Sequence, residues 1–190
     1  MKKTIALAMA GVMLCALPVC AAPSPSAAVV ATTVASSSED ASATVREAAA
    51  AQGKSVAEYV NNAVVEVPGL SEATPMGQGG HVIINGAPSN VTFFLLKPTA
   101  AVVAQAKSQA ATLGGKVLNV VTTTSQVVGK FSTAQVNFYA KGVKAGQLIK
   151  VYQLVNGEWV ELTVTEIRED HVVVNLTSHG TLAFIEVPAV

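Results

Sequence analysis

Hydrophobic and polar residues alternate in short runs along the second half of the chain, a pattern that predicts β-strands. Glycine, asparagine and proline separate these runs, which keeps each expected strand short. The expected strands cover residues 81–85, 91–97, 116–123, 133–139, 148–155, 158–168, 171–176 and 181–187. Many short strands at close spacing favour a β-sandwich or a curled antiparallel sheet.

Two short helices are expected before the strands. Residues 41–52 contain good helix formers, and Gly53 supplies a C-terminal stop. Ser55 and Glu58 have the S-x-x-E spacing of a capping box, which opens a second helix expected to reach about residue 64.

A third helix is expected between the strands, over residues 98–113. Pro98 suits the first turn of this helix and Gly114 suits its end. Alanine and valine recur every three to four residues, so this helix should lie on the sheet. We therefore expect an α+β fold: a β-sandwich or curled antiparallel sheet with one packed helix, preceded by two short helices.

The strongest local signal is Asn156-Gly157 between two apolar runs, because this dipeptide favours the two-residue type I′ turn of a β-hairpin. That turn fixes which residues lie opposite one another. The expected pairs are Val155 with Glu158, Leu154 with Trp159, Tyr152 with Glu161, Val151 with Leu162 and Ile149 with Val164.

This register divides the hairpin into two faces, because directly paired residues point to the same side. Five aliphatic residues are expected to face the core: Ile149, Val151, Val160, Leu162 and Val164. The opposite face carries Tyr152, Leu154 and Trp159, which are too many large apolar groups for a solvated sheet. These three residues either bind a partner or are covered by the 99–113 helix or the helix that contains Tyr59.

The chain begins with the pattern of a secretory signal peptide over residues 1–21. Lys2 and Lys3 precede an apolar run at 5–19, which is too short to span a bilayer. Cleavage before Ala22 is expected. Cys20 offers an alternative, since a lipoprotein signal would leave it as a lipidated first residue.

The composition beyond residue 21 limits the classes of partner. Residues 22–44 are rich in alanine, serine, threonine and proline and are expected to form a low-complexity spacer. A helical segment with a glycine-rich linker at 45–80 and a β-rich domain at 81–190 should follow. The mature chain has no cysteine, and its ten basic against twelve acidic residues argue against nucleic acid as a partner.

The last 110 residues resemble a group of small secreted β-rich proteins from anaerobic Gram-positive gut bacteria. The similar segments are GVKAG at 142–146, VYQLVNGEW at 151–159 and REDHVVVNLTSHGTLAFIEV at 168–187. The resemblance implies a β-rich extracellular module and brings no assigned activity, cofactor or site residue.

Candidate chemistry is sparse. A hydrolase would use Ser178 as nucleophile, a histidine such as His179 as base and Asp170 to orient it, but no G-x-S-x-G motif occurs. No metal-binding or phosphate-binding motif is present, so no metal or cofactor is expected.

Taken together, the sequence predicts a secreted or cell-surface structural or binding module that is not an enzyme. Its partner is an unknown protein or a surface polymer, and a membrane is involved only if Cys20 is lipidated. Four lysines hint at an acidic polymer: Lys130, Lys141, Lys144 and Lys150. The alternatives are a secreted hydrolase that uses Ser178 and a histidine, and a lipid-anchored accessory protein.

Overall fold

The computed structural model describes residues 43–125 and 131–189 of the 190-residue chain. All of them belong to Ser36–Val190, one of the two units into which the chain divides. The expected signal peptide, Cys20, Lys130 and all but the last two residues of the expected spacer lie outside the described residues. Within the described ranges, no helix has the length and apolar character needed to cross a membrane.

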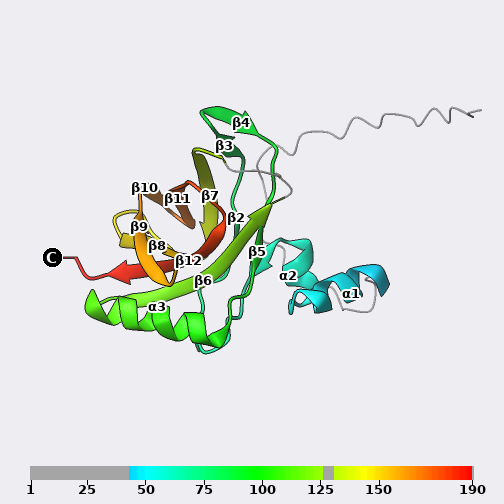
Figure 1. The fold of residues 1–190 in the computed structure, drawn as a ribbon, viewed down its shortest axis with the longest axis horizontal. Coiled ribbons are helices and arrows are strands. Elements are labelled where there is room, and N and C mark those ends of the chain that lie inside the picture. The colour runs from blue at the N-terminus through cyan, green and yellow to red at the C-terminus, as the bar shows by residue number, and fades with distance from the viewer. Residues whose placement is uncertain (1–42, 126–130, 190) are drawn as a thin grey trace, which may run out of the picture. The chain divides into compact units, whose positions relative to one another are not determined.

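The strands form two antiparallel sheets (Figure 1). The first sheet has the order β1 (Ala63–Val64), β2 (Met76–Gln78), β7 (Ala134–Ala140), β11 (His171–Leu176) and β10 (Val164–Arg168), and β3 (Val82–Ile84) joins β7 to β4 (Ala87–Ser89). The second sheet has the order β5 (Phe93–Leu96), β6 (Lys116–Ser125), β12 (Gly180–Val187), β8 (Leu148–Val155) and β9 (Glu158–Leu162).

The core lies between the two sheets. Phe138 of β7 and Phe184 of β12 are fully buried, and their rings meet edge to face with centroids 5.2 Å apart. Inward-facing side chains of both sheets belong to one continuous hydrophobic cluster. This arrangement is a two-sheet sandwich, and it confirms the expected α+β class with mostly β structure.

The packed helix is α3 (Ala100–Thr112), which lies along the second sheet beside β6 and β12 (Figure 1). Its buried face is made of Val103, Ala106 and Ala110, at helical spacing. Thr99 is the N-cap, with its side-chain oxygen accepting from the Val102 N–H, so Pro98 precedes the cap and does not sit in the first turn.

The two expected N-terminal helices are present as α1 (Ala43–Ala51) and α2 (Val56–Val60). The capping box of Ser55 and Glu58 is formed as predicted. The prediction that α2 reaches residue 64 is wrong. Asn62 adopts a positive φ of 50°, which ends the helical path and directs the chain into β1.

One expected strand and one pairing of strands also differ in the structure. The segment 158–168 is not one strand, because β9 pairs with β8 in the second sheet whereas β10 pairs with β11 in the first. The expected strands 81–85 and 91–97 flank Asn85-Gly86 in the sequence, but they do not pair with each other. The turn at Asn85-Gly86 joins β3 to β4, and β5 pairs with β6 in the other sheet. Alternation along a segment indicates strand structure, but it does not say in which sheet each part lies.

The N-terminal segment is joined to the sheets by buried polar contacts. The Asn119 side chain of β6 is fully buried and donates to the carbonyls of Thr74, at 2.6 Å, and Val64, at 3.3 Å. The Thr74 N–H donates to the Leu118 carbonyl at 2.7 Å. The segment expected to be a glycine-rich linker also contains β2, a strand of the first sheet that pairs with β7.

Candidate binding surface on the β8–β9 hairpin

The β8–β9 hairpin has the predicted turn. Asn156 and Gly157 have φ values of 52° and 87°, which glycine and asparagine tolerate best. The expected pairs from Val155–Glu158 to Val151–Leu162 are confirmed. The expected pair of Ile149 with Val164 is wrong, because the chain leaves the second sheet at Thr163 and Val164 pairs with Val174.

Of the three candidate binding residues, Tyr152 is buried, with 4% of its surface exposed. Its hydroxyl donates to Glu161 Oε2 at 3.0 Å, and its side chain also bonds to Gln109 of α3. Burial, followed by the bond to Glu161, raises the pKa of Tyr152 above its usual value. Tyr152 is therefore part of the seat of α3, the second of the two outcomes considered for this face.

Glu161 joins Tyr152 to Lys150, the next residue on the same face of β8. The Lys150 Nζ lies 3.1 Å from Glu161 Oε1 and 3.2 Å from Oε2. This contact raises the pKa of Lys150. Lys150 was expected to belong to a basic stripe with Lys141 and Lys144. Because Lys150 is paired with an acid of its own sheet, it is a poor member of that stripe.

The end of the hairpin is apolar on both faces. Val155 and Val160 point to one side, with 40% and 48% of their surfaces exposed, and the partly exposed Leu154 and Trp159 point to the other. Val160 was expected in the core, and that expectation is wrong, because 48% of its surface is exposed. Trp159 packs against the core cluster, and its indole N–H is buried without a hydrogen-bond partner in the described ranges.

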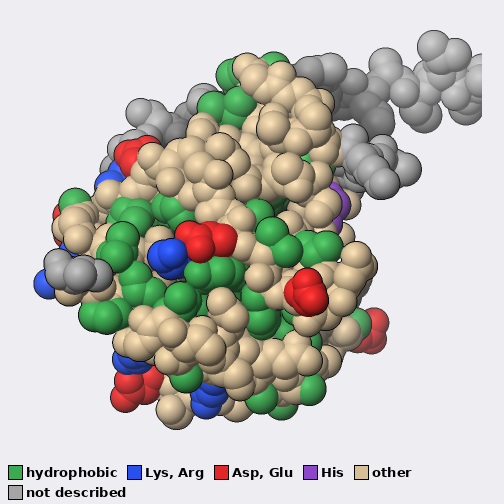
Figure 2. All heavy atoms as spheres, turned by 60° about the vertical axis from the view of Figure 1, so that its left-hand side comes forward, with side chains coloured by type: hydrophobic (Ala, Val, Ile, Leu, Met, Phe, Trp, Pro, Cys, Tyr) green, Lys and Arg blue, Asp and Glu red, His purple; other side chains and the backbone are tan. Residues whose placement is uncertain are grey.

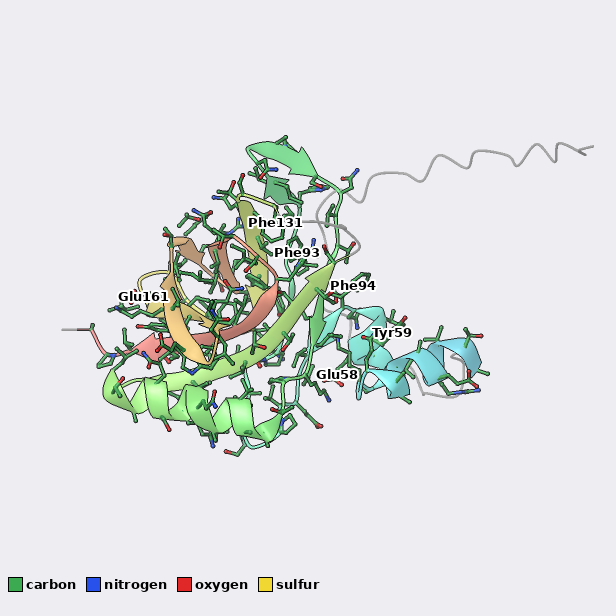
Figure 3. The ribbon with its side chains drawn as sticks, viewed as in Figure 1. Glu58, Tyr59, Phe93, Phe94, Phe131 and Glu161 are labelled. Carbon is green, nitrogen blue, oxygen red and sulfur yellow. The ribbon has the colours of Figure 1, made fainter. Side chains whose placement is uncertain are left out.

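Figure 2 brings forward the side of the molecule on which the β8–β9 hairpin lies in Figure 1. Hydrophobic side chains form a nearly continuous area on this side, around one cationic and one anionic group that touch. Figure 3 places Glu161 on β9, at the far side of the second sheet from Phe93 and Phe94 on β5. Hydrophobic side chains therefore gather on the side of the molecule that carries the hairpin.

The residues of the expected hydrolase do not come together. The Ser178 Oγ accepts from the Gln153 side chain at 3.2 Å, and Asp170 accepts from the Gly142 N–H in a turn. His179 instead pairs through Nε2 with Ser125 Oγ, 3.0 Å away. Sequence reasoning missed Ser125, because 54 residues separate it from His179 and no motif links them.

The His179 ring is held by aromatic neighbours as well as by Ser125. The ring centroids of Phe93 and Phe131 lie 5.1 and 5.2 Å from it, and its Nδ1 is buried with no partner in the described part of the chain. Burial lowers the pKa of His179. A catalytic histidine needs a group on Nδ1 to orient it, and here packing fixes the ring.

The described residues contain one strongly stabilised carboxylate outside the hairpin, that of Glu58 (Figure 3). It accepts from the N–H groups of Ser55, at 2.8 Å, and Val65, at 2.9 Å, and pairs with Lys97 at 3.2 Å. Although burial opposes its ionisation, these contacts lower the pKa of Glu58 to about 2. Both carboxylate oxygens are engaged within the protein, so Glu58 joins α2, β1 and the end of β5.

In the same described ranges, no group of three histidine, cysteine, aspartate or glutamate residues is placed to hold a metal ion. No family model matches the chain, and no curated protein or solved structure matches it. A function for this chain therefore has to be inferred from the geometry of its fold.

Proposed function

We propose that this chain is a non-enzymatic binding module that acts outside the cell or at its surface, and that it binds a protein partner at the end of the β8–β9 hairpin. The observation that carries the proposal is the exposure of apolar side chains on both faces of this hairpin end. They are Leu154 and Trp159 on one face and Val155 and Val160 on the other.

A hairpin at the edge of a sandwich usually hides one face and exposes polar groups on the other. Contiguous exposed apolar groups mark interaction sites more often than single ones do. Trp159 is partly exposed, and tryptophan is one of the residue types enriched among the side chains that contribute most of the binding energy of protein interfaces. A protein partner fits this surface better than a sugar polymer, because Trp159 is its only aromatic group with exposed area and aliphatic side chains surround it.

The hairpin is well suited to present such a surface without rearrangement. Its turn fixes the register, and the contacts of Glu161 with Tyr152 and Lys150 tie β9 to β8. α3 packs on the same sheet, and its Gln109 contacts Tyr152 of β8. A rigid scaffold lowers the entropy that binding costs.

Export supports this role and rests on the sequence pattern of residues 1–21. Intact-mass measurement of the protein in the culture medium and in the cell fraction tests it, with a chain in the medium that begins at Ala22 as the expected result. A diacylated Cys20 would place the module on a membrane, and a retained leader would contradict export.

The binding site is tested by selecting peptides from a phage-displayed library of random linear 12-residue sequences on the chain from Ala22 onward. Enriched peptides should bind Val160→Thr and Trp159→Ala about tenfold or more weakly than the unchanged chain, the loss expected for central contact residues. Ile83→Thr is the matched control, because Ile83 is a β-branched residue of β3 with 38% exposure and lies on the other sheet.

Enriched peptides that bind all three variants equally would contradict the proposed site. A selection that enriches no peptide above an uncoated surface would contradict the proposed function itself. Circular dichroism of each variant confirms that a loss of binding is not a loss of folding.

A further inference from the structure

The two sheets have five edge strands in the described ranges, and four of these edges are protected. β1 has two residues and β4 contains Pro88, which lacks an N–H to offer a neighbouring strand. β10 has an irregular register between Val164 and Glu166. Short strands, proline and bulges are the means by which proteins stop a sheet edge from pairing further.

The fourth protected edge, β5, is closed by two amide side chains. The Phe93 N–H donates to Gln78 Oε1 at 2.7 Å, and the Phe93 carbonyl accepts from Asn62 Nδ2 at 2.8 Å. The Leu95 N–H donates to Asn62 Oδ1 at 3.1 Å. Asn62 and Gln78 therefore take the place of a neighbouring strand at one end of the second sheet.

The other end of the second sheet, β9, has none of these protections in the part of the chain that the structure describes. It is five residues long, contains no proline and pairs with β8 in unbroken register. In a two-residue hairpin, Glu158, Val160 and Leu162 exchange backbone hydrogen bonds with β8, so the N–H and C=O groups of Trp159 and Glu161 point outward. No hydrogen bond within the described ranges occupies these four groups.

We infer that the open edge of β9 binds its partner by strand addition, with an extended polypeptide segment that pairs with Trp159 and Glu161 through its backbone. This inference rests on the proposed function and names how the hairpin binds. The apolar groups on both faces fit this mode, because successive side chains of an added strand point alternately to the two faces. One set would contact Val160 and the other set Trp159.

The charge of the edge favours a basic segment. β9 carries Glu158 and Glu161 and no cation. Glu161 is paired with Lys150, whereas Glu158 is exposed and has no ion pair among the described residues. A second copy of this chain would bring two acidic strands together, while a lysine or arginine opposite Glu158 would complete a cross-strand ion pair.

The test compares Glu161→Pro with Glu161→Ala. Both variants lose the contacts with Tyr152 and Lys150, but only proline removes the outward N–H of residue 161, and an edge strand tolerates proline. The probes are two nine-residue peptides in which threonine and valine alternate, except at three positions. These positions are lysine in one peptide and glutamate in the other. Binding is measured by isothermal titration on the chain from Ala22 onward.

We expect the lysine peptide to bind the unchanged chain at least tenfold more tightly than the glutamate peptide, and Glu158→Gln to reduce this preference. We expect Glu161→Pro to bind the lysine peptide at least tenfold more weakly than Glu161→Ala does. Equal binding by these two variants, or no binding of either peptide to the unchanged chain, would overturn strand addition. The proposed function would still stand if library peptides lost binding on Val160→Thr.

A second measurement covers the case in which Glu161→Pro does not fold. Amide hydrogen exchange at Trp159 and Glu161 in the unchanged chain should slow when the lysine peptide binds, because the added strand accepts from both N–H groups. Unchanged exchange at these two amides in the peptide complex would show that the peptide lies elsewhere.

Discussion

Glu58 provides a direct test of how the N-terminal segment is held to the sandwich. The substitution is Glu58→Gln, which keeps the size of the side chain and removes its charge. Its carboxylate is 6% exposed and contacts the backbone of Ser55 and Val65 and the ammonium group of Lys97. The amide cannot ion-pair with Lys97, and its NH₂ group faces N–H donors that need an acceptor.

The size of the effect follows from the pKa of Glu58, which folding lowers from 4.5 to about 2. One pKa unit corresponds to about 1.4 kcal/mol, so the ionised carboxylate stabilises the fold by about 3 kcal/mol. A lowered carboxylate pKa means that the unfolded chain binds the proton first. This stabilisation is therefore complete above pH 4.5 and is lost as the pH falls towards 2.

Urea denaturation of both proteins at pH 7, 5, 4 and 3 measures the difference in unfolding free energy. We expect Glu58→Gln to be less stable by about 2–3 kcal/mol at pH 7. The difference should shrink between pH 4.5 and 3, because the unchanged chain loses its advantage there. A difference that stays constant with pH would refute the argument, since it would show that the charge of Glu58 contributes nothing. Lys116→Gln is the matched control, because its ion pair with Glu72 is exposed and should contribute less than 1 kcal/mol.

Three further predictions concern the interior. Asn119→Leu should lower the unfolding free energy by about 2–4 kcal/mol in urea denaturation, because the carbonyls of Thr74 and Val64 lose the donor that the buried Asn119 amide supplies. A change below about 0.5 kcal/mol would contradict this role. Gly115→Ala should lower the melting temperature, because an added Cβ would lie 2.5 Å from the Glu186 carbonyl, and an unchanged melting temperature would show that the strands separate freely. The unchanged chain should lose stability relative to His179→Gln as the pH falls from 7 to 5. Burial lowers the pKa of His179 in the folded chain, so the unfolded chain takes up the proton first, near pH 6.5. Parallel pH profiles of the two proteins in urea denaturation would show that His179 is not desolvated.

Local signals in the sequence were sufficient for several elements. The Asn156-Gly157 turn predicts its own hairpin, because the positive φ values that it needs are properties of those two residues. The capping box of Ser55 and Glu58 is equally local, since both partners lie within one turn. The recurrence of alanine and valine over residues 98–113 likewise predicts a helix that lies on the sheet, as α3 does.

Local sequence signals did not predict which strands share a sheet. The alternating pattern continues from β9 into β10, although Thr163 is where the chain passes from one sheet to the other. Alternation of apolar and polar residues shows that the two faces of a strand differ. It does not show which strands are its neighbours in the sheet. The exposure of Val160 shows the same limit, because alternation along β9 does not say whether another element covers its inward face.

The sequence by itself determined the α+β class, the hairpin register and the face on which Tyr152, Leu154 and Trp159 lie. Only the tertiary structure decided that α3 covers Tyr152, that Asn62 and Gln78 close one edge of the second sheet, and that β9 leaves the other edge open. The physical reason is distance along the chain. Turns and caps depend on residues a few positions apart, whereas edges and covered faces depend on residues brought together from 15 to more than 40 positions away.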